Sequence, residues 1–344
     1  MNRTSKMRSG CSRRELLWAS ALGTAALLGA ALPGRPLAAD LVEMRIAAVV
    51  ADTSSVYVGT DLMKQELEGA YPDRFELTVH KGTLGKGERQ LYEALQLGTL
   101  DGVLATTGPL SAFVPEADLF NLPFLFKSPE HAFRVVDGEV GEWFNEKMLE
   151  KGFRVLGWWT IGTRNTSNSV RAIEKPSDYE GLKIRTMESP PFIALYKALG
   201  ATPVPMSINE VYTALQQGTI DGIDGSLPAQ LEFKHIEVLD YAAVTDHVVL
   251  LFPFTVSEAW WQSLPEDLRG AIAAAEKSAR VEQRAADQAY SEKIEAEWKA
   301  QGKTVTHPEI GPFQEIAKQI YPQFYDQVGG KEIFDKIEAI GEGL

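Results

Sequence analysis

The stretch "LYEALQLGTLDG", residues 91–102, returns as "VYTALQQGTIDG", residues 211–222. From Tyr92 and Tyr212 onward, eight of eleven positions are identical. Solenoids repeat at short, fixed periods, whereas two copies 120 residues apart indicate two similar units within one molecule. The repeat therefore predicts a chain with two related halves.

Strand and helix patterns alternate around the first copy. The apolar and alternating runs at 44–50 and 75–80 are typical of strands, and the chain after Gly102 begins another. Residues 53–70 and 88–97 show helical periodicity, and Gly98 follows as a helix-ending residue. This succession predicts a parallel sheet with helices on both faces, an α/β fold.

The second copy has the same surroundings. Residues 181–187 and 201–206 are typical of strands, and residues 191–199 of a helix. A further helix is expected from Ser207, which has Glu210 at the spacing of a capping box. Since open α/β sheets bind ligands beyond the carboxyl ends of their strands, the segments that follow each copy are the candidate ligand contacts.

A single long helix is predicted near the C-terminus. The stretch "SLPED" (263–267) has capping-box spacing, no proline follows until Pro308, and a helical period continues to Trp298. About 36 residues at about 1.5 Å rise give a helix of roughly 54 Å, longer than one domain. We expect it to brace both halves; a coiled coil is the alternative, but alanine dominates its apolar stripe.

The N-terminus has the layout of an export signal. Basic residues precede an uncharged run, residues 16–34, and "RPLAAD" offers a cleavage site after Ala39. The twin arginine in "SRREL" indicates the twin-arginine route. A membrane anchor is the alternative, although no stop-transfer charge cluster follows. Residues 1–39 include Cys11, the only cysteine, so the mature chain has no disulfide.

Composition excludes several classes of partner. The 344 residues are 44% hydrophobic and 24% charged, which fits a globular protein of two domains. Without residues 1–39, which hold six basic and one acidic residue, 28 basic and 46 acidic residues remain, a formal net charge of −18. Such a charge argues against nucleic acid and against an anionic membrane surface as partners.

The sequence shows no catalytic or metal-binding motif. It has no G-x-S-x-G elbow, no H-E-x-x-H and no paired cysteines, and its five histidines never fall at i, i+4. We therefore expect a binding protein with no catalytic residue, metal or cofactor. An exported hydrolase, which would need a nucleophile beside a base, and a ligand-sensing receptor for a signalling partner are the alternatives.

Several dense stretches, in order along the chain, resemble the extracytoplasmic solute receptors of TRAP (tripartite ATP-independent periplasmic) transporters, the dicarboxylate-receptor-like group. They include "PEADLFNLPFLFKSPEHA", "GTRNTSNS" and "PSDYEGLKIRTMESPPFIALYKALGATPVPMSINEVYTALQQGTIDG". The resemblance covers essentially all of the mature chain. It implies a periplasmic receptor that captures a small organic acid by its carboxylate, delivers it to the transporter's membrane subunits and acts as a monomer.

The resemblance also implies the architecture, a two-lobed periplasmic binding protein (clamp) with a hinge and a long helix spanning both lobes. We expect lobe I to hold residues 40–162 and 251–290, and lobe II to hold residues 163–250 and 291–344. Closure of the two lobes would bury the ligand between them.

Ligand-binding residues follow from the matching stretches. Arg185 in "GLKIR" matches the arginine that holds the ligand carboxylate as a two-pronged ion pair, a role that suits the planar guanidinium. Arg164 in "GTRN" matches a second position. The remaining candidates are first-lobe residues that touch the rest of the ligand and aromatic residues that wall the pocket: Glu88, Thr106, Thr107, Trp159, Phe192 and Phe254.

One stretch departs from the family pattern. Where the family often has D-G-Q-E-N-P, this chain has "DGIDGS" (221–226), so that Gly225 replaces an asparagine that contacts ligand. Asp224 either binds a ligand hydroxyl or orients an arginine. Specificity for sialic acid or a C4-dicarboxylate is therefore not carried over, and a monocarboxylate with an apolar or hydroxylated body stays compatible with the sequence.

Overall fold

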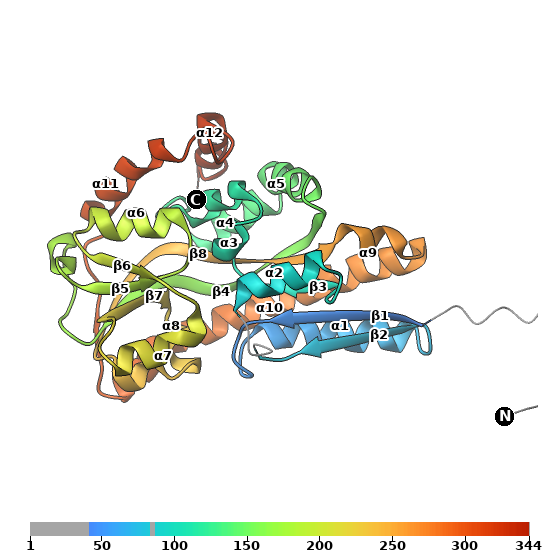
Figure 1. Ribbon diagram of the computed structural model, residues 1–344, viewed down its shortest axis with the longest axis horizontal. Coiled ribbons are helices and arrows are strands. Elements are labelled where there is room, and N and C mark those ends of the chain that lie inside the picture. Colours follow the sequence, from blue (N-terminus) through green and yellow to red (C-terminus); the bar gives the residue numbers. More distant parts are fainter. Residues whose placement is uncertain (1–40, 83–86, 344) are drawn as a thin grey trace, which may run out of the picture. The chain divides into compact units, whose positions relative to one another are not determined.

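The computed structural model describes residues 41–82 and 87–343 (Figure 1). Its strands in this part of the chain join one nine-stranded sheet. They are β1 (Val42–Ala48), β2 (Phe75–His80), β3 (Gly102–Leu104), β4 (Phe153–Asn168), β5 (Lys183–Thr186), β6 (Thr202–Pro205), β7 (Gly222–Ser226), β8 (Tyr241–Ser257) and β9 (Thr304–Thr306).

The sheet runs in the order β2-β1-β3-β8-β4-β7-β5-β6, with β9 on β8. β1 pairs in parallel with β2 and β3, and β5 pairs in parallel with β6 and β7. Between these groups, β8 and β4 pair with each other antiparallel, from Phe153–Ser257 to Asn168–Tyr241. The parallel strands expected around each copy of the repeat are confirmed. The antiparallel pair between the two groups was not predicted; there one long strand leaves the first group for the second and the other returns.

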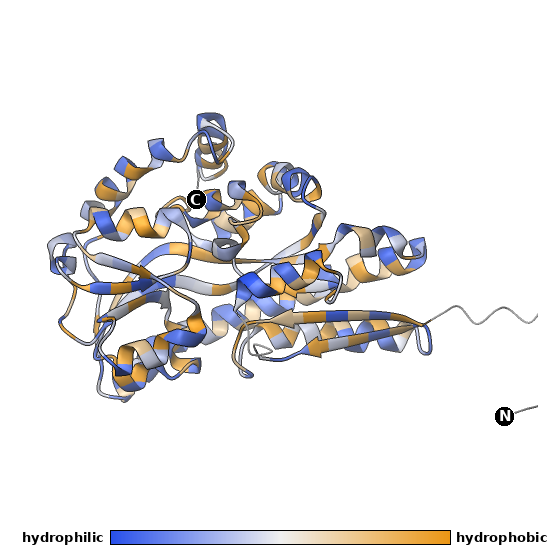
Figure 2. Ribbon diagram, viewed as in Figure 1, coloured by the Kyte–Doolittle hydropathy of each residue, from blue (hydrophilic) through white to orange (hydrophobic). Residues whose placement is uncertain are grey.

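Helices cover the sheet, and in Figure 2 they carry both hydrophobic and hydrophilic residues, as amphipathic helices do. The α-helices are α1 (Val56–Ala70), α2 (Glu88–Gln96), α3 (Thr107–Leu110), α4 (Pro129–Val136), α5 (Glu139–Leu149), α6 (Pro190–Ala198), α7 (Ile208–Gln216), α8 (Leu227–Glu232), α9 (Glu258–Ser263), α10 (Glu266–Ala300), α11 (Gly311–Ile320) and α12 (Lys331–Ile340). Short 3₁₀ helices span Pro115–Asn121, Pro176–Tyr179, His235–Val238 and Tyr321–Gln323.

Both faces of the sheet are buried. Successive residues of β1 alternate between hydrophobic clusters, since Ala47 packs in one and Ile46 in another. The first cluster also takes residues of α2, α4, α5, α6, α11 and α12. The second takes residues of α1 and α10, and a third lies under α7 and the C-terminal part of α10. Helices on both faces were predicted from the sequence, and the structure confirms them.

The long helix predicted near the C-terminus is α10, which has 35 residues. Its first half contributes Ile272 and Ala279 to the cluster with β1 and α1, and its last turns contribute Ile294 and Trp298 to the cluster with α7. One unbroken helix therefore joins two hydrophobic clusters, which confirms the bracing role.

The predicted capping boxes are wrong. The N-cap residue of α10 is Pro265, not Ser263. Ser263 is instead the last residue of α9, and its hydroxyl donates to the carbonyl oxygen of Trp260 at 2.6 Å. Ser207 does occupy the N-cap position of α7, but its side chain makes no capping hydrogen bond. Spacing alone did not distinguish a serine in a capping box from a serine that ends the preceding helix.

The repeated phrase has the same structure in both copies. Helices α2 and α7 each end at a glycine in the left-handed region, Gly98 at φ 70° and Gly218 at φ 68°. Most L-residues avoid this region, because Cβ there approaches the following carbonyl. The glycines therefore serve the helix ends rather than a ligand.

The aspartate of each phrase fixes a parallel strand pair. Asp101 accepts from the backbone N–H of Arg45 in β1 at 2.8 Å, and Asp221 accepts from the backbone N–H of Lys183 in β5, also at 2.8 Å. Both cations then reach back to the glycine carbonyl at the preceding helix end. The repeat thus specifies helix end, turn and strand pairing twice.

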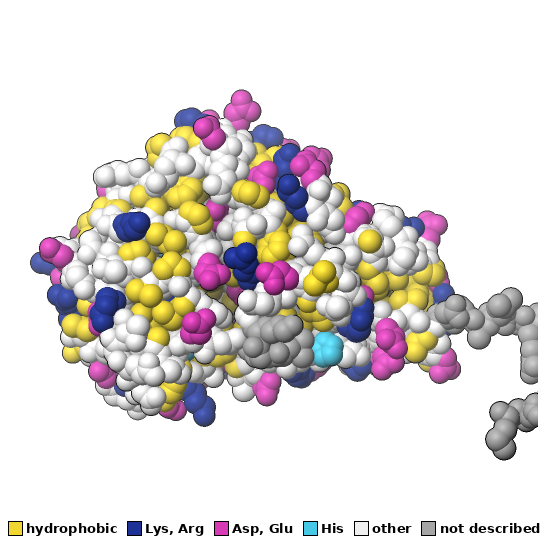
Figure 3. Space-filling view, viewed as in Figure 1, with side chains coloured by type: hydrophobic (Ala, Val, Ile, Leu, Met, Phe, Trp, Pro, Cys, Tyr) yellow, Lys and Arg dark blue, Asp and Glu magenta, His cyan; other side chains and the backbone are white. Residues whose placement is uncertain are grey.

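None of the helices in residues 41–82 and 87–343 is long and apolar enough to cross a membrane. On the face shown in Figure 3, acidic and basic side chains are interspersed.

Candidate ligand-binding site

A cavity lies beyond the carboxyl ends of the strands, where the sequence predicted ligand contacts. Loops after β1, β3 and β5 and the end of β7 line it, with Ser54, Thr106, Arg185 and Ser226 among the lining residues. Helix α10 closes another side through Asp287. The cavity therefore gathers segments from both copies of the repeat and from the bracing helix.

Arg185 is the buried cation of this cavity. It donates from Nε at 3.0 Å and from Nη2 at 2.8 Å to the carbonyl oxygen of Met206, in the loop between β6 and α7. Burial, together with the positive charge of Arg164, lowers the pKa of Arg185 to about 10, so the group stays charged at neutral pH. Among the described residues, no carboxylate lies within ion-pair distance of it.

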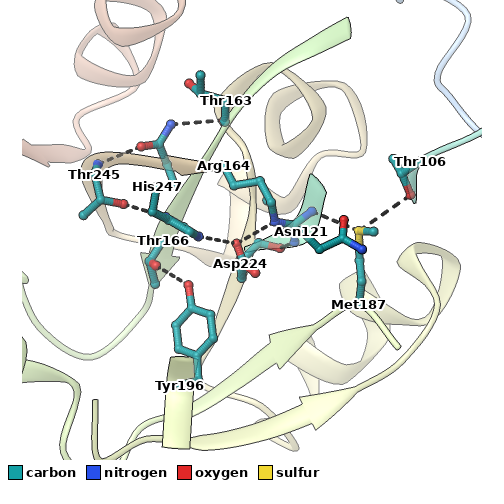
Figure 4. Close-up of polar contacts among 12 residues, drawn as sticks. Thr106, Asn121, Thr163, Arg164, Thr166, Met187, Tyr196, Asp224, Thr245 and His247 are labelled. Carbon is teal, nitrogen blue, oxygen red and sulfur yellow. Dashed lines mark hydrogen bonds and ion pairs between the residues drawn. The ribbon is translucent and has the colours of Figure 1, made fainter. Parts of the chain in front are cut away.

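Arg164 also lines the cavity, but its charge is already paired (Figure 4). From β4, it donates through Nε to Asp224 Oδ1 at 2.9 Å and through Nη2 to the Asp224 carbonyl oxygen at 2.6 Å. Nη1 lies 2.9 Å from the sulfur of Met187, and the guanidinium stands 4.5 Å from the ring centroid of Phe192. These contacts hold Arg164 in one orientation.

Asp224 is fully buried on β7 and binds a second partner besides Arg164, because His247 Nε2 lies 3.1 Å from its Oδ1 (Figure 4). Burial alone would raise the pKa of Asp224, but the charges and hydrogen bonds of Arg164 and His247 outweigh it and lower that pKa. Of the two roles considered for Asp224, the geometry favours orienting an arginine over binding a ligand hydroxyl.

Glu88 and Thr106 meet in the cavity wall. Glu88, the first residue of α2, accepts from the Thr106 backbone N–H at 2.8 Å and from its hydroxyl at 2.6 Å. Burial raises the pKa of Glu88, against these bonds and the nearby arginines. Thr107 points elsewhere, since its hydroxyl donates to the buried Asn121 at 2.7 Å and the residue does not line the cavity.

The three aromatic candidates lie in packing positions. Trp159 and Phe254 contact each other within the cluster under α1 and α10, and the Trp159 indole donates to Glu276 at 3.0 Å. Phe192 lies beneath the guanidinium of Arg164. None of the three lines the cavity, so we retain Phe192 only as support for Arg164 and do not retain the other two as ligand contacts.

Comparison with known proteins decides the family. The profile of the DctP family, bacterial extracellular solute-binding protein family 7, matches residues 46–327. This chain belongs to that family. A solute-binding protein from Verminephrobacter eiseniae is 37% identical over 270 residues, which cover 78% of this chain and 80% of the relative.

Solved TRAP periplasmic solute-binding proteins have the same fold. A TRAP periplasmic solute-binding protein from Polaromonas sp. JS666, bound to D-erythronate, matches with a TM-score of 0.83 and 33% identity over 87% of this chain and 98% of its own. One from Sulfurospirillum deleyianum, bound to succinate, matches with a TM-score of 0.82 and 29% identity over 88% and 99%. The two-lobed fold and the TRAP receptor family expected from the sequence are confirmed, and the family is one of solute receptors rather than enzymes.

The cavity of this receptor has an acidic part that the sequence did not reveal. Glu232, at the end of α8, and Asp287, on α10, both line it. Burial raises the pKa of each to about 7, and the charge of Asp287 adds to the shift at Glu232. Tyr290, one turn along α10, lines the same part of the cavity.

The acidic residues left no signal in the sequence. Asp287 stands among charged residues of a helix whose polar side looks solvated, and Gln283 and Glu276 on the same helix are buried as well. A buried acid and an exposed acid look alike within a polar helix face. These residues are buried because α10 packs against the sheet, which the sequence of the helix alone does not show.

The structure shows no metal centre in the described residues, where no group of three or more His, Cys, Asp or Glu side chains is placed to hold a metal ion. Gly225, which replaces the family's asparagine, lines the cavity, and a Cβ built on it would meet its nearest neighbour at 3.6 Å. That position therefore leaves room where a polar side chain stands in the family pattern.

Proposed function

We propose that this receptor captures a small organic acid by its carboxylate, which Arg185 binds, and delivers it to the membrane subunits of a TRAP transporter. The observation that carries this proposal is that Arg185, a buried cation of the cavity, has no carboxylate within ion-pair distance among the described residues. Arg164, by contrast, has a carboxylate partner in Asp224. A ligand carboxylate would supply the counter-charge that Arg185 lacks, through the two-pronged geometry that guanidinium favours.

The bound ligands of the solved relatives support the same reading. The Polaromonas receptor holds D-erythronate and the Sulfurospirillum receptor holds succinate, both organic acids. These two compounds are therefore the first probes for this chain.

Calorimetric titration of wild type, Arg185→Ala and Arg185→Lys with D-erythronate and succinate tests the proposal. Removing one partner of a buried ion pair costs roughly 3–5 kcal/mol, so we expect Arg185→Ala to lose affinity by a factor of roughly 10² to 10³. Arg185→Lys should also bind weakly, because an ammonium cannot reproduce the fork. Melting curves without ligand should change far less.

Arg134→Ala is the matched control, because Arg134 pairs with Glu130 on an exposed helix face. It should bind like wild type. If Arg185→Ala stays folded and binds within about threefold of wild type, the carboxylate is held elsewhere, and Arg164 is the next residue to test.

The proposal extends to location and assembly. Residues 1–39, which lie outside the described residues, would be a twin-arginine signal cleaved near Ala39, and the mature receptor would act in the periplasm as a monomer that neither turns over its ligand nor binds nucleic acid. The lobes would have the boundaries expected from the sequence, with β4 and β8 as the two long strands that pass between them.

A further inference from the structure

We propose that the ligand carries hydrogen-bond donors, hydroxyl or ammonium groups, away from its carboxylate, and that Glu232 and Asp287 accept them. The inference rests on the proposed capture of a carboxylate by Arg185. It concerns the acidic part of the same cavity, where α8 and α10 meet the loop after β1.

A directed chain of hydrogen bonds makes Asp287 an acceptor. Gln283 Nε2 donates to the hydroxyl of Ser55 at 3.0 Å, and that hydroxyl donates to Asp287 Oδ1 at 3.2 Å. Gln283 is itself fixed, because it bonds both the N–H and the carbonyl of Thr160. Asp287 thus accepts the proton of the Ser55 hydroxyl, and its carboxyl lines the cavity, where it can accept a further hydrogen bond.

Glu232 has less support from the protein. In the described residues its carboxyl has no hydrogen-bond partner, and neither Glu232 nor Asp287 has a lysine or arginine within ion-pair distance. Asp287 is buried and Glu232 is half-buried, and because neither has a counter-charge, desolvation raises the pKa of both to about 7. A ligand hydroxyl or ammonium placed between them would satisfy acceptors that the chain leaves open.

The same arrangement selects against a second ligand carboxylate. Arg185 lies among charges other than these two, namely Arg164, Asp224, Glu88 and Glu188. The acidic part of the cavity is thus separate from Arg185 and offers no cation to a second ligand carboxylate. Above about pH 7, where both carboxyls ionise, a linear dicarboxylate would also bring like charge to Glu232 and Asp287, whereas a hydroxylated or amino acid brings a donor.

Four acids of equal carbon number separate these cases: D-erythronate carries hydroxyls, 4-aminobutyrate an ammonium, succinate a second carboxylate and butyrate none of these. We expect wild type to bind D-erythronate or 4-aminobutyrate about tenfold or more tightly than succinate and butyrate, the scale of one charge-assisted hydrogen bond. Tighter binding of D-erythronate would identify the preferred donor as a hydroxyl, and tighter binding of 4-aminobutyrate would identify it as an ammonium.

The isosteric variants Glu232→Gln and Asp287→Asn should each reduce that preference by about threefold or more and improve the relative binding of succinate. Glu282→Gln, on the exposed side of α10, should keep the wild-type preference. Melting curves of all variants confirm that they are folded.

The experiment distinguishes failure of the acidic subsite from failure of carboxylate capture by Arg185. If the acids bind through Arg185 but succinate or butyrate binds as tightly as the donor-bearing acids, or if both variants keep the wild-type preference, the acidic subsite is refuted and carboxylate capture stands. If none of the four acids binds wild type, carboxylate capture fails and the subsite fails with it.

Discussion

Arg164 Nε and Asp224 Oδ1 form an ion pair at 2.9 Å in which both side chains are buried. A buried pair contributes little net stability, because desolvation of two charges offsets their attraction, yet removal of one partner is costly. The pair also gives the two arginines of the cavity different roles. Asp224 neutralises Arg164, whereas Arg185 has no such partner and its charge stays available for a ligand.

Asp224→Asn should therefore destabilise the ligand-free protein. The change leaves the guanidinium of Arg164 buried without a counter-charge, so we expect the free energy of unfolding to fall by roughly 3–5 kcal/mol. Denaturant unfolding measures it. Glu130→Gln, which breaks the exposed pair with Arg134, is the control and should cost less than about 1 kcal/mol. Equal effects of the two changes would contradict the assigned role of Asp224.

The raised pKa of Asp287 predicts a pH dependence of stability. Its pKa is about 7 in the folded chain against 3.8 for an unperturbed aspartate, so between these values the folded state binds more protons than the unfolded state. The free energy of unfolding should then fall as pH rises from about 4 to about 7.

Asp287→Asn isolates that contribution. From pH 5 to pH 8, wild type should lose about 2.5–3 kcal/mol more than the variant, at about 1.4 kcal/mol for each pH unit in which the native proton is retained. Urea unfolding of the ligand-free proteins at both pH values provides the comparison. Parallel pH profiles for wild type and variant would show that Asp287 titrates normally.

Because the two copies of the repeat have the same structure, the same substitution in each should lower the free energy of unfolding by the same amount. Gly98→Ala and Gly218→Ala should each lower the free energy of unfolding by about 1–2 kcal/mol, because both residues have positive φ although a Cβ would meet nothing within 4 Å. Gly270→Ala, in the exposed interior of α10, should instead raise it by about 0.5–1 kcal/mol. A neutral effect at either repeat glycine would contradict the strain argument.

The proposed lobes predict a ligand-dependent change of size. Closure about β4 and β8 should reduce the radius of gyration when the acid that binds most tightly is saturating. Small-angle scattering with and without that acid measures the change, and Arg185→Ala under the same conditions should keep the larger radius. An unchanged wild-type radius at saturation would count against the hinge.

The proposed export route predicts the fate of a double variant. Changing Arg13 and Arg14 together to lysine should leave precursor in the cytoplasm, because twin-arginine export depends on that pair. Fractionation followed by immunoblotting detects it, with a single Arg8→Lys change as control. Normal periplasmic accumulation would assign the protein to the general secretory route and would leave ligand capture unaffected.

Local features were predictable from the sequence. The helix ends at Gly98 and Gly218 and the length of α10 followed from residue type and spacing, because each depends on a few neighbouring residues. Arg185 was found through its motif, and the structure places it in the cavity at the end of a strand.

Features that depend on distant segments were not predictable. The central antiparallel pair joins residues far apart in the chain, from Phe153 with Ser257, 104 positions apart, to Asn168 with Tyr241, 73 positions apart. Neither strand shows its partner in its own pattern. Likewise, the acidity of the cavity depends on Asp287 meeting Ser55 across more than two hundred residues. The hydrophobic periodicity of a segment shows which of its sides is apolar, but not which other segment packs against that side.

The position of α10 also determines when the fold can be completed during synthesis. Strand β1 and helix α1 bury their apolar side against Leu268, Ile272 and Ala279, which are translated more than two hundred residues later. Until those residues leave the ribosome, the N-terminal segment exposes the part of its apolar side that packs against α10. Strand β1 and helix α1 can therefore be fully packed only near the end of translation, and a chain truncated before residue 268 should be a substrate for chaperones and proteases rather than a smaller stable domain.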